Sequence, residues 1–288
     1  MARPVARRAV SKIRPCAGSA AALLALVVPS SAPAAAQEAP LTGPDTEIVD
    51  LTHPFGESTI YWPTAEPFAL EVVSEGQTAA GWYAAKSFCA AEHGGTHLDA
   101  PIHFAEGART SAEIPLEDLI GDAVVIDVAA AAAADPDLEI GVEALGAWES
   151  ANGAIPARAI VLLRTGWGER WPDAERYLGT AARGQDAVAD LHFPGLSEEG
   201  AARLVERGVR AVGIDTASID RGQSTEFRAH RVLAAANVPI FENVANLDRV
   251  IVRGATIVAL PMKIEGGTGG PLRIVALQPR ILPGAPGE

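Results

Sequence analysis

The 288-residue sequence is short of cysteine, of aromatic residues and of basic charge. With only Cys16 and Cys89, a fold held together by several disulfides is excluded. Lys and Arg number 23 against 36 Asp and Glu, a net charge of −13, so the basic surface typical of nucleic-acid-binding proteins is missing. No apolar run of about 18 residues occurs after residue 40, so no membrane-spanning helix is expected there.

Two common enzyme motifs are also missing. The sequence has no Gly-x-Ser-x-Gly element, which argues against a serine hydrolase. The glycine-rich stretch 266–270 lacks the Gly-Lys-Ser/Thr ending of a phosphate-binding loop, so we interpret it as a loop near the functional site. The chain is 48% hydrophobic and 20% charged, and this hydrophobic content is enough to form one substantial buried core.

The first 36 residues are typical of a secretory signal peptide. Residues 1–14 carry five basic and no acidic residues, an apolar stretch follows at 20–28, and small residues lead up to Ala36. Cleavage after Ala36 would change the net charge from −13 to about −18. We therefore expect an exported protein, periplasmic or secreted, with no membrane attachment after cleavage. The alternative is an amphipathic or disordered N-terminal extension.

From Glu47 onward, strand-like and helix-like segments alternate, which indicates one α/β domain over residues 37–288. Short runs rich in apolar and β-branched residues predict strands at 47–51, 68–73, 83–90, 123–128, 159–164, 209–214, 238–241, 256–260 and 272–277. Helices are predicted at 138–148, 197–206 and 227–236. The alanine-rich stretch 129–137 is low in complexity and is expected to be a surface excursion.

Three of the six histidines lie within one eleven-residue segment, His-Gly-Gly-Thr-His-Leu-Asp-Ala-Pro-Ile-His, which runs from His93 to His103. Its proline and paired glycines disfavour a helix, and in an extended chain residues two apart point to the same side. His97, Asp99 and His103 would then project together, while the glycines let His93 fold back toward them. Imidazoles and a carboxylate suit a divalent transition metal such as zinc or manganese.

A ligand set this compact is expected to be completed from elsewhere, and the carboxyl-terminal half offers His230 and Glu242. Glu242 lies in the apolar run 238–244, where a carboxylate is costly unless it binds something positive. The alternative for His230 is a histidine on the surface of a helix, and the alternative for Glu242 is a glutamate at the end of a strand, facing water. Asp215 ends a predicted buried strand, where it could orient a ligand or cap the following turn.

The histidine-rich segment resembles the signature of the metal-dependent cyclase family, which includes bacterial kynurenine formamidases and isatin hydrolases. The resemblance runs over most of the mature chain and takes in Asp50–His53, Tyr61–Pro63, Gly213–Thr216, Phe241–Asn243 and Leu260–Gly267. The strings 213–220, 235–246 and 259–267 are most similar to isatin hydrolase-like members. The resemblance implies a single cyclase-like, swivelling β/α domain with a mixed central sheet or a partial barrel.

The resemblance also implies roles for the histidines and carboxylates. In the formamidases the first histidine, the second histidine and the aspartate of the motif bind metal, which here are His93, His97 and Asp99. The last histidine, His103, would donate and accept the proton. Its alternative role is that of a plain ligand, which would leave proton transfer to Glu242. A downstream histidine and a glutamate twelve residues later complete a two-metal site, and His230 and Glu242 have this separation.

Near the substrate, an early tryptophan of the family corresponds to Trp62, and the family comparison places His53 near the mouth of the site. With Asp215, these are our candidate substrate-binding residues. The formamidases tend to have Trp-Pro-Gly-Asp, whereas Trp62-Pro63 is followed here by Thr-Ala, a departure that leaves the substrate open. Phe55 and Trp82 are expected to pack in the core.

The expected activity is hydrolysis of an amide C–N bond in a small aromatic substrate through metal-activated water, with one or two Mn²⁺ or Zn²⁺ ions per subunit. Ring opening of a cyclic amide, isatin to isatinate, is the first candidate, and deformylation of N-formylkynurenine to kynurenine and formate is the second. The alternative class is an exported protein that binds a metal or an aromatic ligand without turnover. A homodimer or homotetramer is implied by the family alone.

Overall fold

The computed structural model describes residues 42–280. The predicted signal peptide, residues 1–36, lies outside this range. Within the range, the structure contains no helix that is both long and apolar enough to cross a membrane. The sheet strands are β1 (Thr46–Asp50), β4 (His97–Asp99), β5 (Ile120–Asp127), β7 (Ile160–Arg164), β9 (Ala211–Ile214), β10 (Ile240–Glu242), β11 (Arg253–Pro261) and β12 (Gly269–Pro279).

These eight strands form one sheet in the order β1-β12-β11-β5-β7-β9-β10-β4, and β4 also pairs with β12. Seven strands therefore close into a barrel, with β1 attached along β12. β5, β7, β9 and β10 run parallel, and the other pairings are antiparallel. The predicted α/β class with a mixed sheet is confirmed.

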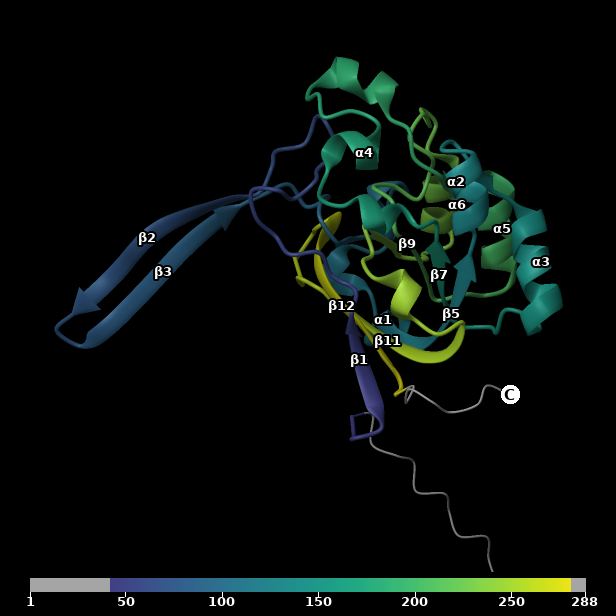
Figure 1. Ribbon diagram of the computed structural model, residues 1–288, viewed down its shortest axis with the longest axis horizontal. Helices are drawn as coiled ribbons and strands as arrows, with labels where there is room; N and C mark the ends of the chain where they lie inside the picture. The colour runs from purple at the N-terminus through teal and green to yellow at the C-terminus, as the bar shows by residue number, and fades with distance from the viewer. Residues whose placement is uncertain (1–41, 281–288) are drawn as a thin grey trace, which may run out of the picture. The chain divides into compact units, whose positions relative to one another are not determined.

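Side-chain alternation along the parallel strands builds one core on each face of the sheet. On β5, Ala123 and Val125 point into the barrel, whereas Val124 and Ile126 pack on the outer face. Figure 1 shows three helices along the parallel strands, and their apolar side chains cover this outer face. They are α3 (Val142–Asn152), α5 (Glu198–Glu206) and α6 (Arg228–Ala235).

Shorter elements connect the barrel strands. They are the helices α1 (Leu116–Leu119), α2 (Ala129–Ala134) and α4 (Ala174–Leu178), the strand pair β6 (Glu139–Ile140) and β8 (Gly195–Leu196), and 3₁₀ turns that include Pro101–His103. The cluster of Ile60, Trp167, Tyr177 and Phe193 packs beneath α4 and the turns around it. This cluster supports the side of the domain on which Trp62 lies.

One secondary-structure prediction is wrong at its start. The helix predicted at 138–148 begins only at Val142, because Ile140 is buried and lies in β6, where it pairs with β8. The stretch 129–137 does lie largely at the surface, as expected, but it begins with the helix α2, of which Ala132 is fully buried. Alanine has the highest helix propensity, and the Asp127 carboxylate accepts the backbone N–H of Ala129 at the start of this helix.

The short strand β4 closes the barrel and carries the middle of the histidine-rich segment. Glu242 of β10 lies opposite His97, and Gly269 of β12 lies opposite Asp99. Because side chains alternate, Leu98 points into the barrel core while His97 and Asp99 share the opposite face. A Cβ on Gly269 would lie 2.6 Å from Cε1 of His93, so glycine permits the close approach of that ring.

β2 (Ala69–Thr78) and β3 (Gly81–Cys89) pair only with each other, in a hairpin that extends away from the barrel (Figure 1). We call residues 69–89 the arm. Phe68 at its base stacks on Phe88, with ring centroids 5.7 Å apart. Six large apolar side chains of the arm are more than half exposed: Leu70, Val72, Val73, Trp82, Tyr83 and Phe88. The expectation that Trp82 packs in the core is therefore wrong.

Closure of the barrel by β4 generates a stability prediction. Leu98→Ala should lower the free energy of unfolding by about 2–5 kcal/mol, because Leu98 is fully buried and its loss leaves a cavity. The matched control is Leu116→Ala, since Leu116 is 61% exposed and should change stability by less than about 0.5 kcal/mol. Urea denaturation measures both, and equal losses would contradict this account of the core.

Candidate active site

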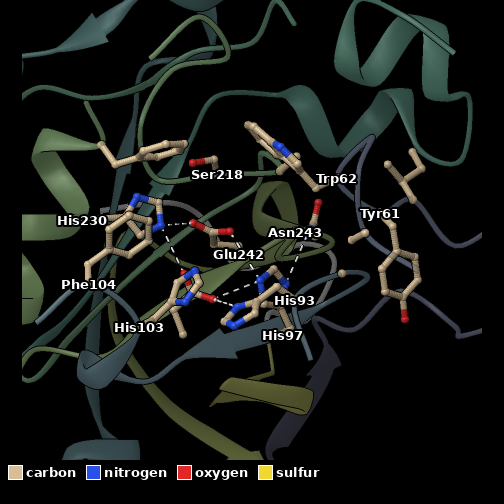
Figure 2. Close-up of a pocket in the computed structure, with 16 residues that line it drawn as sticks. Tyr61, Trp62, His93, His97, His103, Phe104, Ser218, His230, Glu242 and Asn243 are labelled. Carbon is tan, nitrogen blue, oxygen red and sulfur yellow. Dashed lines mark hydrogen bonds and ion pairs between the residues drawn. The ribbon is translucent and has the colours of Figure 1, made fainter. Parts of the chain in front are cut away.

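A cavity of about 310 Å³ lies beside β4 and β10. Its titratable lining gathers on one side with Phe104 packed against it, and Trp62 lies across the cavity (Figure 2). The titratable side chains are His93, His97, Asp99, His103, His230 and Glu242. The aromatic side chains are Tyr61, Trp62, Phe104 and Phe227.

Three imidazoles converge on the carboxylate of Asp99. His93 Nδ1 lies 2.6 Å from Asp99 Oδ1, and His97 Nε2 lies 3.1 Å from the same oxygen. His230 Nε2 lies 3.1 Å from Asp99 Oδ2. Glu242 adds a second carboxylate, with its oxygens 3.1 Å from His230 Nε2 and 3.4 Å from His97 Nε2. The structure thus brings together all five residues that the sequence nominated as metal ligands.

Hydrogen bonds fix the outer nitrogen of two of these rings. His97 Nδ1 donates to the carbonyl of Gly95 at 2.9 Å. His230 Nδ1 donates to Asp220 Oδ2 at 2.7 Å, and the same carboxylate accepts the backbone N–H groups of Ala229 and His230. With its outer nitrogen protonated, each neutral ring turns an unprotonated Nε2 toward the two central carboxylates.

His93 is fixed in the same way by a different pair of residues. The hydroxyl of Thr268 donates to Glu92, so it accepts the Nε2 proton of His93 at 2.9 Å. This leaves His93 Nδ1 as the nitrogen that faces Asp99. Gly95 reaches the required backbone conformation with a φ of +58°, which few side chains tolerate. The predicted folding back of His93 is what the structure shows.

The donor set fits a divalent cation. Lone pairs of three imidazoles cannot face two carboxylates at these distances unless protons or a cation lie between them. His97 Nε2 is buried and, within residues 42–280, makes no hydrogen bond of its own. Two sets of ligand atoms each lie within 4.8 Å of one another and share Asp99: His93, Asp99 and His103, and His97, Asp99 and Glu242. Nitrogen and oxygen donors in this mixture suit zinc or manganese.

The imidazoles and carboxylates of the cluster shift one another's pKa values. Burial alone would lower the pKa of His230, but hydrogen bonds to Asp220, Asp99 and Glu242 raise it well above its usual value. Burial would likewise lower the pKa of His97, and its attraction to the carboxylates of Asp99 and Glu242 raises it. Burial would raise the pKa of Asp99, yet the neighbouring histidines, His93 first, hold it well below its usual value. A bound cation therefore has to displace protons from these imidazoles.

His103 lies at the edge of the cluster, in the 3₁₀ turn after β4. Its ring stacks on His93, with centroids 3.9 Å apart, and meets the edge of Phe104. Removal of water around the ring lowers the pKa of His103 to about 4. The imidazole is thus uncharged at neutral pH and can accept a proton. Geometry alone allows it to be either a ligand or a base, the two roles that the sequence left open.

The aromatic side of the cavity includes Trp62, as the sequence predicted. Trp62 and Phe227 lie 6.4 Å apart between ring centroids, and Phe104 and Phe227 lie 5.3 Å apart. Between these rings and the imidazoles lies Ser218, whose Oγ is buried and has no hydrogen-bond partner among residues 42–280. Sequence reasoning missed Phe104, Phe227 and Ser218, because none of them belongs to a motif with recognisable chemistry.

Two candidate substrate-binding residues do not line the cavity. The ring of His53 stacks flat on Trp171 at 4.2 Å, and its role in substrate binding stays a prediction. Asp215 does end the buried strand β9, but its carboxylate accepts hydrogen bonds from Thr165 N, Thr165 Oγ1 and Gly166 N. These contacts turn Asp215 toward the end of the neighbouring strand β7. Its role is to hold that turn, and it is not available to a substrate.

The residues that orient the ligands were also missed. Asp220, Thr268 and Glu92 fix His230 and His93, as described above. Asn243 donates to the carbonyl of Gly95, next to the bond from His97, and accepts from the hydroxyl of Tyr177. The signals in the sequence were two direct neighbours, Glu92 before His93 and Asn243 after Glu242, since Asp220 and Thr268 are more distant from the histidines that they orient.

Orientation of His230 by Asp220 generates a prediction on metal affinity. Asp220→Asn removes the charged acceptor that keeps the proton on Nδ1, so affinity for Zn²⁺ or Mn²⁺ should fall about 10–100-fold. Competition with a chromophoric chelator measures this affinity. The matched control is Asp186→Asn, an exposed residue outside the cavity, which should leave the affinity unchanged. Equal affinity of both variants would show that Asp220 does not act on the ligand.

Comparison with known proteins matches residues 49–221 to the family model described as "Putative cyclase". The isatin hydrolase of Roseibium aggregatum is 32% identical over 246 residues, which cover 83% of this chain and 89% of that protein. The kynurenine formamidase of Bacillus mycoides is 28% identical over 230 residues, 79% of this chain and 95% of that protein. The solved structure of isatin hydrolase A from Ralstonia solanacearum is 35% identical, with a TM-score of 0.73, over 81% of this chain and 92% of that chain.

These matches agree with the closed mixed sheet and with the histidine-rich segment that β4 carries. The family match spans the larger part of the chain, and the similarity to the Roseibium protein extends over most of both sequences. The resemblance first noticed in the motif is therefore confirmed: this chain belongs to the cyclase family.

Proposed function

We propose that this protein is a metal-dependent hydrolase that cleaves the amide C–N bond of a small aromatic substrate, with ring opening of isatin to isatinate as the leading reaction. The observation that carries the proposal is the cavity itself, where three imidazoles and two carboxylates face aromatic side chains. Relatives named isatin hydrolase at 32% and 35% identity support the substrate class.

The five converging side chains would hold the metal. They are His93, His97, Asp99, His230 and Glu242. When bound, a divalent cation polarises a carbonyl oxygen and makes water acidic enough to react near neutral pH. We propose one or two ions, Mn²⁺ or Zn²⁺, because Asp99 is shared between two sets of ligand atoms.

His103 is the group on this chain best placed to move the proton. Its ring is uncharged at neutral pH and lies at the edge of the cluster, where it can take a proton from the attacking water. The same ring can return that proton to the nitrogen that leaves when the amide bond breaks. Glu242 is less suited to this role, because its Oε1 already accepts the backbone N–H of Ile219 at 2.7 Å.

The opposite side of the cavity positions the substrate. Trp62 and Phe227 offer apolar faces to a flat ring and exclude water from the reacting bond. The Ser218 hydroxyl, buried among them without a partner within the described residues, is available to hydrogen-bond a polar atom of the substrate. A planar bicyclic amide presents an apolar ring and adjacent carbonyl oxygens, which matches this division of the cavity.

We also propose that the protein works outside the cytoplasm, after removal of residues 1–36. The support is the order of basic, apolar and small residues in that segment. Mass spectrometry of the protein recovered from a periplasmic fraction would show an N-terminus at residue 37 if the proposal is right.

The substrate and the metal can be tested together. Metal-loaded protein should consume isatin, and treatment with EDTA should reduce the rate at least about 100-fold, with recovery on addition of Mn²⁺ or Zn²⁺. The loss of isatin absorbance measures the reaction, and N-formylkynurenine is assayed in parallel. Faster turnover of N-formylkynurenine would move the assignment to a formamidase. Metal binding without turnover of either compound would favour a binding protein.

Replacement of His103 tests its role. His103→Ala should retain the metal and lose about 10²–10⁴-fold in kcat, because the proton acceptor is removed. Metal content by atomic emission and kcat are measured on the same preparation. His192→Ala is the control, since this exposed histidine pairs with Asp137 away from the cavity and its loss should leave kcat unchanged. A metal-free His103→Ala protein would assign His103 as a ligand.

A further inference from the structure

We propose that Phe227 determines which substrates the cavity accepts, and that it selects flat, uncharged aromatic rings over rings that carry an amino-acid side chain. This inference rests on the proposed function, since it names the substrate class of the same cavity. The two candidate substrates differ in this respect, because isatin is planar and uncharged whereas N-formylkynurenine carries an ammonium and a carboxylate group on a tetrahedral carbon. The support is the backbone conformation of Phe227, the position of its ring and the charge of the cavity lining.

The backbone of Phe227 has a conformation that its residue type rarely adopts. Its φ of +49° and ψ of +49° lie in the left-handed region, where the Cβ atom comes too close to the following carbonyl oxygen. Within residues 42–280, five non-glycine residues have a positive φ: Arg158, Phe227, Asn237, Asn243 and Asn246. Asparagine tolerates this region through its short polar side chain, and phenylalanine has no such compensation. Conformations of this kind persist where surrounding contacts impose them, and they are concentrated at binding and catalytic sites.

Hydrogen bonds to Ser224 and Asp220 impose this conformation. The backbone N–H of Phe227 donates to Ser224 Oγ at 3.1 Å, and the same hydroxyl donates to Asp220 Oδ1 at 3.4 Å. The Asp220 carboxylate also accepts the N–H groups of Ala229 and His230, in the first turn of α6. The chain thus turns sharply at Phe227 while residues before and after it bond to one buried carboxylate. Ser224 is therefore a positioning residue for the Phe227 ring.

The Phe227 ring lies in the aromatic part of the cavity lining. Its centroid is 5.3 Å from that of Phe104, 6.4 Å from that of Trp62 and 5.9 Å from that of His230. Phe227 thus contacts both the imidazole side of the cavity and Trp62, which lie across from each other in Figure 2. A flat ring can stack on such aromatic faces, whereas a substituent on a tetrahedral carbon would hold the ring away from them.

The cavity offers no partner for the charged groups of an amino acid. Among residues 42–280, its lining contains no lysine and no arginine. Arg228 follows Phe227 directly, but it lies outside the cavity lining and pairs with Glu198 and Glu226. A carboxylate bound beside Phe227 would lose its hydration without gaining an ion pair, which is unfavourable. The two carboxylates of the lining are the proposed metal ligands, so they are not free to pair with an ammonium group.

Equilibrium dialysis with indole and free tryptophan tests the inference without relying on turnover. The two probes share one flat bicyclic ring, and tryptophan adds the amino-acid side chain. The metal-loaded, unchanged protein should bind indole at least about 10-fold more tightly than tryptophan. Phe227→Gly should bring the two dissociation constants to within about threefold of each other, because the aromatic face is lost and space opens beside the bound ring. Phe227→Tyr keeps an aromatic face and should retain the preference.

The variants are chosen to separate the ring from the backbone. Glycine adopts a positive φ without strain, so Phe227→Gly should fold, which circular dichroism checks. The matched control is Arg158→Gly, since Arg158 has a φ of +63° and lies outside the cavity lining. It relieves the same kind of strain elsewhere and should leave both dissociation constants unchanged. Ser224→Ala should weaken the preference for indole to a smaller extent, and Ser224→Thr, which keeps the hydroxyl, should restore it.

Kinetics separate failure of this inference from failure of the proposed function. In a protein that hydrolyses isatin, Phe227→Gly should raise KM at least about 10-fold and change kcat less than about threefold, because the ring binds the substrate and moves no proton. An unchanged preference in Phe227→Gly would overturn the inference and leave the hydrolase intact, as would a failure of the unchanged protein to bind indole. Loss of the preference in Phe227→Gly without turnover of either substrate would support the inference and overturn the hydrolase alone.

Discussion

The site depends on one electrostatic constraint, the gathering of three imidazoles around the buried carboxylate of Asp99. Such a group is unfavourable in a nonpolar interior unless positive charge balances the carboxylates of Asp99 and Glu242. The same two carboxylates raise the pKa values of His97 and His230, which favours protons on these rings when no cation is bound. A divalent cation supplies the positive charge more completely, since it also satisfies the lone pairs of every ring. The arrangement of the whole cavity follows from the need to hold these groups together.

Within the barrel, strand β4 holds two of these groups in place. Three residues of strand, paired on both edges, place His97 and Asp99 on one face and anchor them through Leu98 on the other. Glu242 arrives from β10 in direct register with His97. The remaining ligands come from loops and helices whose ring orientations are fixed by single hydrogen bonds, as with Asp220 and His230. The strand pairing thus sets the positions of the ligands, and the surrounding polar residues set the direction of each ring.

Sequence reasoning found His93, His97 and Asp99 because their chemistry and spacing are local, whereas the family resemblance joined His230 and Glu242 to them. His97 and Asp99 are two residues apart, which is the period of a strand, and the apolar neighbours of Glu242 indicated that it is buried. Asp215 was misassigned because the end of a buried strand does not reveal which way a carboxylate turns, and here Thr165 captures it. The α2 helix was missed because an alanine run gives no amphipathic pattern, although Ala132 packs in the core. In both cases, contacts between residues distant in the sequence determine the structure, namely the orientation of Asp215 and the position of α2.

The ligands are drawn from points far apart in the chain, between His93 and Glu242, and this has a consequence for biogenesis. A chain that lacks the β4–β10 and β4–β12 pairings does not present the complete set, so an ion that needs all five proposed ligands would bind only after the ring of strands has closed. Because such an ion would bind the folded chain and not the unfolded chain, its binding would stabilise the folded state.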